Sequence, residues 1–134
     1  MTRVSNQKLD KLVAKEIWNQ LGETIGRLSA SKADPFLESI LTPTEQIMLA
    51  KRLAIIVLID EGHTDYAISK TLRVSSSTVA RLRETYNFGS YRPVLSGLKK
   101  NKADYVDFVN TLVDVIHIGL PRYAGPDRWK LLKK

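Results

Sequence analysis

Residues 66–82 read YAISKTLRVSSSTVARL, and this segment guides the interpretation of the whole chain. It meets the requirements of a helix-turn-helix, in which two short helices cross at a steep angle over a turn of three or four residues. Ile68 and Leu72 give the first helix an apolar face, because residues four apart lie on the same side of a helix. Val79 and Leu82, three apart, do the same for the second helix.

The turn between the two helices is also recognisable. Val74 supplies an apolar residue for the turn to bury, and the hydroxyl of Ser75 suits the N-cap of the second helix. Arg73 stands where glycine is common, so we expect it to adopt a left-handed backbone at a cost of about 1 kcal/mol. The segment therefore predicts helices at 65–72 and 76–87, with the helix-turn-helix spanning about 65–84.

The outward face of the second predicted helix carries side chains that suit contact with duplex DNA. Small side chains let the backbone approach base edges, hydroxyls donate or accept hydrogen bonds, and arginine binds guanine or phosphate. The start of the first helix is expected to contact the DNA backbone. The acids Asp65 and Glu84 bring negative charge close to this face. The predicted DNA-binding residues are Thr64, Asp65, Tyr66, Ser75, Ser76, Ser77, Thr78, Ala80, Arg81 and Arg83.

Most of the remaining chain also has helical periodicity, with apolar residues every three or four positions and no period-two pattern that would predict a sheet. The segment LTPTE at residues 41–45 predicts a helix start, with Thr42 as N-cap, Pro43 in the first turn and Glu45 reaching back to the cap amide. Gly62 suits the left-handed end of that helix. The other expected elements are a helix at about 5–30, a loop at 29–32, a short helix from Asp34-Pro35 to Leu41, a loop around 87–93 and a helix at 102–118.

Composition narrows the class of protein. The chain has 134 residues, 21 Lys and Arg against 14 Asp and Glu, and a formal net charge of +7, which favours a polyanionic partner such as nucleic acid. The absence of cysteine excludes disulfides and Cys-type zinc sites. No apolar segment suits a secretory signal or a membrane span, so we expect a cytoplasmic protein.

Nothing in the sequence predicts an enzyme. His63 and His117 are the only histidines, and neither has a nucleophile or a metal ligand at useful spacing. The acids of the 102–118 helix are spaced as a solvated face and make a poor metal site. We therefore expect no catalytic residue, no metal and no cofactor.

From Leu41 to Gly89 the chain resembles the Trp repressor superfamily and, within it, the YerC/YecD-type relatives. The residues that carry the resemblance are Leu41-Thr42-Pro43, Glu45, Arg52, Gly62 and Ser75–Arg81. The resemblance implies an all-α, intertwined homodimer that places two helix-turn-helix heads in successive major grooves. It divides the chain into a core and head at 1–89 and a helical extension with a basic tail at 90–134. A monomer whose helices pack on themselves is the alternative.

The resemblance also implies a corepressor pocket, although this chain departs from it. Leu82 stands where the Trp repressor has a glycine under the indole ring, so we expect no tryptophan to bind. In the simpler interpretation, Arg52 pairs with a carboxylate such as Glu45 or Asp60, and Arg81 contacts phosphate. The positions that match the pocket are Thr42, Arg52, Arg81 and Thr85.

These observations favour a sequence-specific regulator of transcription that binds double-stranded DNA, with repression implied by the family. Two alternatives remain open. One is a protein–protein adaptor that keeps the helix-turn-helix as a scaffold, and the other is the DNA-recognition part of a mobile-element protein. The extension at 90–134 has no assigned role; a second dimer contact, an effector interface and a phosphate contact all fit its sequence.

Overall fold

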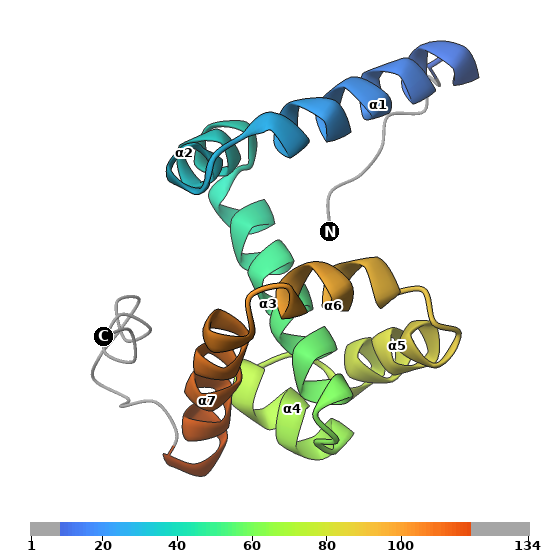
Figure 1. The fold of residues 1–134 in the computed structure, drawn as a ribbon. Helices are drawn as coiled ribbons and strands as arrows, with labels where there is room; N and C mark the ends of the chain where they lie inside the picture. The colour runs from blue at the N-terminus through green and yellow to red at the C-terminus, as the bar shows by residue number, and fades with distance from the viewer. Residues whose placement is uncertain (1–8, 119–134) are drawn as a thin grey trace. The chain divides into compact units, whose positions relative to one another are not determined.

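The computed structural model describes residues 9–118, and within this range the chain forms seven α-helices and no strand (Figure 1). The predicted all-α fold is therefore confirmed. No helix of this range is both long and apolar enough to cross a lipid bilayer. The helices are α1 (Lys11–Arg27), α2 (Ala30–Ile40), α3 (Pro43–Asp60), α4 (Asp65–Leu72), α5 (Ser76–Asn87), α6 (Arg92–Lys99) and α7 (Lys102–Ile118).

The chain divides into two compact units, Met1–Gln46 and Ile47–Lys134, which we call the first and the second unit. The boundary falls inside α3. The second unit contains the helix-turn-helix together with α6 and α7. The division at residue 89 that the sequence suggests separates a family-like part from an extension, and it remains a prediction.

The first unit contains α1 and α2, and neither helix has a buried residue. Asp10 begins α1, because its carboxylate accepts a hydrogen bond of 2.9 Å from the amide of Leu12. The loop predicted at 29–32 is wrong: α2 begins directly after Ser29, whose carbonyl accepts bonds from the amides of Lys32 and Ala33. Pro35 consequently lies inside α2 rather than at its start, and α2 lacks one amide donor there.

The start and end of α3 follow the prediction closely. Glu45 accepts a 2.9 Å bond from the amide of Thr42, and the Thr42 hydroxyl accepts a 3.2 Å bond from the amide of Glu45, which together form a capping box. The bond from the Thr42 amide to the Glu45 carboxylate is the largest of the causes that lower the pKa of Glu45. At the other end, Gly62 has a φ of +87°, and the amide of His63 bonds the carbonyl of Leu58. Glycine tolerates this left-handed backbone, so α3 ends here.

The core of the second unit surrounds the C-terminal half of α3, with α4, α5 and α7 placed around it in Figure 1. Burying apolar side chains supplies most of the free energy that holds such helices together. The side chains of this core come from every helix of the second unit except α6. They are Ala54, Ile55, Val57, Leu58, Ile59, Ile68, Leu72, Val79 and Leu112.

The structure corrects the prediction for α6 and agrees with the predicted bounds of α7. We predicted a loop through Pro93, but α6 begins at Arg92 with Pro93 in its first turn, a position that proline favours because no amide partner is needed there. Helix α7 has the predicted bounds. Its Leu112 and Val115 are buried, and Tyr105 and Phe108 pack on the core, so α7 is an integral part of the second unit.

Candidate nucleic-acid interface

The two helices of the helix-turn-helix begin where the sequence predicts, each at a hydroxyl cap. The Thr64 hydroxyl accepts a 3.1 Å bond from the amide of Ala67 at the start of α4. The Ser75 hydroxyl accepts a 3.1 Å bond from the amide of Thr78 at the start of α5. Each cap satisfies one amide that a helix would otherwise leave without an acceptor.

The packing behind α5 decides which of its faces is presented outward. Val79 is fully buried against Ile68 and Leu72 of α4, and Leu82 is half-buried against the same core. The opposite face of α5 is exposed at Ser76, Ser77, Ala80 and Arg81, and at the cap residue Ser75. Thr78 is half-buried, with its hydroxyl 2.7 Å from that of Ser75. The N-terminal half of α5 is thus accessible to a partner.

Arg73 ends α4 in the left-handed conformation that the sequence predicts, with φ 55° and ψ 51°. It is the only residue other than glycine with a positive φ among residues 9–118. Its amide and that of Val74 both bond the carbonyl of Ser69, which closes the turn. An arginine costs about 1–2 kcal/mol more than glycine in this conformation.

Arg83 is held inside the helix-turn-helix rather than presented on its surface. Its Nε atom lies 2.6 Å from a carboxylate oxygen of Asp65, and its Nη2 atom donates a 2.7 Å bond to the carbonyl of His63. These bonds tie α5 to the start of α4. They also neutralise Asp65, one of the two acids that bring negative charge close to the predicted DNA-binding face. In contrast, Arg81 is exposed and forms no ion pair with any residue in the described range.

The exposed face of α4 adds an aromatic residue and a cation. Tyr66 is largely exposed, and the amine of Lys70 lies 5.8 Å from the centre of its ring. Such a cation–π contact restrains both side chains on one side of α4. A hydroxyl and an amine are therefore available together near the helix start that we predicted to contact the DNA backbone.

Asp60, the last residue of α3, forms hydrogen bonds with side chains of α5, α6 and α7. It accepts 2.8 Å bonds from the Tyr86 hydroxyl of α5 and the Lys99 amine of α6, and a 3.4 Å bond from the Tyr105 hydroxyl of α7. Burial raises the pKa of the Asp60 carboxyl, but the bonds from Lys99, Tyr86 and Tyr105 outweigh it, so that its pKa is lowered. Burial and the acids Glu61 and Asp60 raise the pKa of Tyr105 to about 12.

Replacing this carboxylate gives a testable expectation. Asp60→Asn should lower the free energy of unfolding at pH 7 by about 1–3 kcal/mol, because three donors lose a charged acceptor. The lowered pKa of Asp60 means that its stabilisation is complete above about pH 4 and is lost as the pH falls further. Chemical denaturation at several pH values measures both effects.

At alkaline pH, the stability of the folded protein is expected to fall as the pH rises. The pKa values of Lys99 and Tyr105 are raised, Lys99 chiefly by its bond to Asp60, so their stabilisation is complete below about pH 10 and is lost as the pH rises towards 12. Asp107→Asn, at an exposed aspartate beyond the first turn of α7, is the matched control and should leave stability nearly unchanged. If both variants unfold alike at every pH, Asp60 does not hold these helices.

The positions that match a corepressor pocket do not form the ion pairs we expected. Arg52 is exposed and pairs with neither Glu45 nor Asp60, so that expectation is wrong. Asp60 is occupied by Lys99, and Glu45 by the cap of α3. Of the four positions, Thr42 caps α3 and the Thr85 hydroxyl bonds the carbonyl of Arg81 at 3.2 Å. Ligand binding at these residues remains untested.

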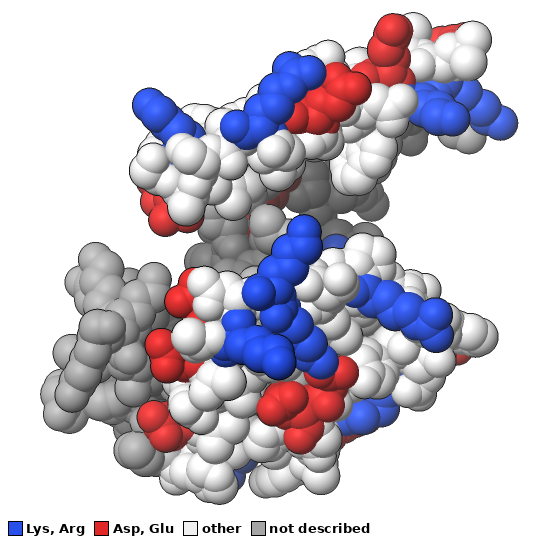
Figure 2. All heavy atoms as spheres, in the orientation of Figure 1, with Lys and Arg blue, Asp and Glu red and all other residues white. Residues whose placement is uncertain are grey.

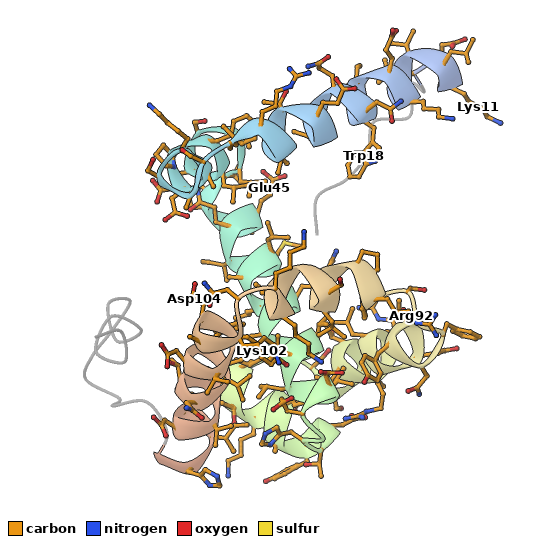
Figure 3. The ribbon with its side chains drawn as sticks, viewed as in Figure 1. Lys11, Trp18, Glu45, Arg92, Lys102 and Asp104 are labelled. Carbon is orange, nitrogen blue, oxygen red and sulfur yellow. The ribbon has the colours of Figure 1, made fainter. Side chains whose placement is uncertain are left out.

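Charge on the second unit is unevenly spread. Residues 47–118 carry ten Lys and Arg against seven Asp and Glu. Figure 2 shows basic side chains gathered on one face of this unit, next to a smaller acidic group. Figure 3 places Arg92 at the start of α6, and Lys102 and Asp104 at the start of α7. Concentrated positive charge of this kind attracts polyanions at long range.

Helices α4 and α5 and the turn between them form a helix-turn-helix, and the rest of the regular structure among residues 9–118 is also α-helical. These features define a helix-turn-helix protein. Residues 16–96, more than half of the chain, match the sequence model of the family described as Trp repressor protein. The chain therefore belongs to the Trp repressor family, a family of DNA-binding regulators. The match includes all of α2 to α5 and ends inside α6, so α7 lies beyond it.

One curated relative supports this placement. The uncharacterized protein YerC of Bacillus subtilis (strain 168) is 24% identical over 99 residues, which cover 72% of this chain and 95% of that protein. No solved structure matches the chain significantly.

Some features of the interface could be read from short-range sequence patterns, and others could not. The caps, the exposed face of α5 and the strained turn were predicted. The Arg83–Asp65 pair and the Asp60 contacts join residues 18 to 45 positions apart, and no local pattern indicates such pairs. The roles of the individual residues in DNA contact remain predictions.

Proposed function

We propose that this protein is a sequence-specific regulator of transcription, acting as a repressor, that inserts α5 into the major groove of double-stranded DNA. One observation carries the proposal: the N-terminal half of α5 is exposed, begins after the cap residue Ser75 with two more serines, and bears an arginine that pairs with no acid among residues 9–118, while its other face is fixed in the core. The protein then acts in the cytoplasm, with the DNA.

The residues divide into two groups by their chemistry. Contacts to phosphate come from the start of α4, where the side chains of Thr64 and Tyr66 are exposed. Contacts to base edges come from Ser76, Ser77, Ala80 and Arg81 on the exposed face of α5. Arg83 acts indirectly, by fixing α5 against α4 through Asp65.

We further propose that two copies of the chain form a homodimer. Among the described residues, the first unit has exposed apolar side chains, including Ile17 and Trp18 of α1, which are 56% and 71% exposed. Trp18 is labelled in Figure 3. Apolar surface of this extent on a short helix is costly in water and favours association. The family to which the chain belongs supports a second copy as the partner.

Tryptophan is not proposed as a corepressor. Leu82 is half-buried and packs on the core from α5. The resemblance to the family matches it to a glycine beneath the indole ring, which supports the view that its side chain leaves no room for tryptophan. A ligand pocket needs a cavity, and a leucine at this position removes room for one.

The proposal is tested by selecting bound duplexes from a random library and measuring binding of the selected site by fluorescence anisotropy at two salt concentrations. A DNA-binding regulator should enrich one motif and lose affinity steeply as salt rises. An adaptor that keeps the helix-turn-helix only as a scaffold should enrich no motif and bind weakly at both salt concentrations.

Arg81 provides the sharpest single test of base recognition. Arg81→Ala should weaken binding to the selected site by about 1–3 kcal/mol, because an arginine to guanine contact is worth that much. Binding to unrelated duplexes should change far less. An equal loss on selected and unrelated DNA would assign Arg81 to phosphate contact, and no loss on either would remove it from the interface.

A further inference from the structure

The turn of the helix-turn-helix carries an arginine at a backbone position that favours glycine. Arg73 has a φ of 55°, and no other residue except glycine has a positive φ in the described range. Residues held in such conformations persist where the surrounding structure or a function demands them. The turn itself is closed by backbone bonds to Ser69, which a glycine would form equally well. The side chain of Arg73 therefore needs another explanation.

A second cation lies at the same turn. The amine of Lys51, on α3, donates a 3.4 Å bond to the backbone carbonyl of Arg73. Neither Lys51 nor Arg73 forms an ion pair with any acid among residues 9–118, and Arg73 is exposed. The amine of Lys51 thus lies at the residue that ends α4, and that residue is itself a cation without an acidic partner in the described part of the chain.

The start of α5 adds to this positive region. Arg73 precedes Ser76, the first residue of α5, by three positions, which span at most about 10 Å of chain. The N-terminus of a helix carries a partial positive charge and free amides. The major groove is about 12 Å wide, so a long side chain beside a helix that enters it can reach the phosphates of the groove edge.

We propose that Arg73 and Lys51 form a phosphate-binding site at the turn, which grips the DNA backbone beside the groove that α5 enters. This inference rests on the proposed function, since it requires α5 to enter the groove. Arg73 supplies the exposed guanidinium, and Lys51 supports the turn and adds a second charge. The strained backbone is then retained because the side chain it carries contributes to binding.

The test separates stability from affinity. Arg73→Gly relieves the left-handed strain, so the thermal midpoint of unfolding should stay equal or rise by up to about 5 °C. Affinity for the selected duplex should nevertheless fall about 5-fold for each head at 0.15 M salt. The slope of the logarithm of the binding constant against the logarithm of the salt concentration should become less steep by about 0.9 per head. For a dimer with two engaged heads, the corresponding changes are about 30-fold and about 1.8.

Two further variants examine the charges themselves. Arg73→Lys keeps a positive charge and should bind within about twofold of the unaltered protein. Lys51→Gln removes the charge, and because the bond that it loses is long and exposed, this variant should weaken binding by at least about twofold with little loss of stability. Unchanged binding by Lys51→Gln would exclude Lys51 from the site, and weak binding by Arg73→Lys would contradict a role for charge.

Lys32→Gln, at an exposed lysine of α2 outside the helix-turn-helix, is the control for a general loss of positive charge. An equal loss of affinity in Lys32→Gln and Arg73→Gly would overturn the site, as would an Arg73→Gly protein that binds like the unaltered one. If the unaltered protein binds DNA without dependence on salt, or not at all, the proposed function fails as well. The two failures are therefore distinguishable.

Discussion

Ile17→Asp is expected to convert a dimer of twice 15.1 kDa into a 15.1 kDa monomer and to weaken binding to the selected duplex by about 100-fold or more. Ile17 lies near the middle of α1 and is 56% exposed, so the substitution should not disturb the fold of one copy. A carboxylate buried in a dimer interface without a partner is strongly unfavourable. Sedimentation and fluorescence anisotropy measure the two effects.

The large effect on DNA binding follows from linkage of two heads. When one head is bound, the second binds at a high effective concentration, and a monomer loses this advantage. Asn19→Asp is the matched control, because it adds the same charge two residues later, about 200° around the same helix. An Ile17→Asp protein that remains dimeric would contradict the proposed interface, and a monomer that binds DNA as well as the unaltered protein would contradict the two-head mechanism.

Leu112→Ala is expected to lower the free energy of unfolding by about 2–4 kcal/mol. Leu112 lies on α7, is only 5% exposed, and belongs to the core that holds Ile68 of α4 and Val79 of α5. Its truncation leaves a cavity behind the helix-turn-helix, and the lost packing is not recovered when the core relaxes only partly. Chemical denaturation measures the loss of stability.

Val106→Ala provides the control on the same helix, since Val106 is 52% exposed and its truncation should change stability by less than about 0.5 kcal/mol. If Leu112→Ala unfolds at the same denaturant concentration as Val106→Ala, α7 is not part of the core. The expected result makes α7 a structural requirement of the helix-turn-helix, even though it lies beyond the part of the chain that matches the family.

Where local chemistry is strong, the sequence predicts the fold well. The bounds of α4, α5 and α7 match the prediction because each has a regular apolar face and a recognisable start. The capping box of Thr42 and Glu45 is likewise a local device, formed by residues three apart. The exposed face of α5 follows directly from the burial of Val79.

The errors arise where a proline was taken as a boundary. Pro35 lies inside α2, because the cap at Ser29 starts the helix earlier, and Pro93 opens α6 rather than extending a loop. Pro93 occupies a first-turn position at which a missing amide costs little, whereas Pro35 removes one backbone bond from the interior of α2. The pairing of Asp60 with Lys99, in place of Arg52, depends on how α6 packs, and no spacing in the sequence encodes that choice.

The bonds from Arg83 to Asp65 and to the carbonyl of His63 join α4 and α5 in the free protein. The angle between these helices is consequently set during folding, and little further ordering is required when a duplex arrives. Association of a preorganised head forfeits less conformational entropy than that of a mobile one. Calorimetry on an Arg83→Ala protein should therefore show a less favourable binding entropy, with most of the intermolecular contacts retained.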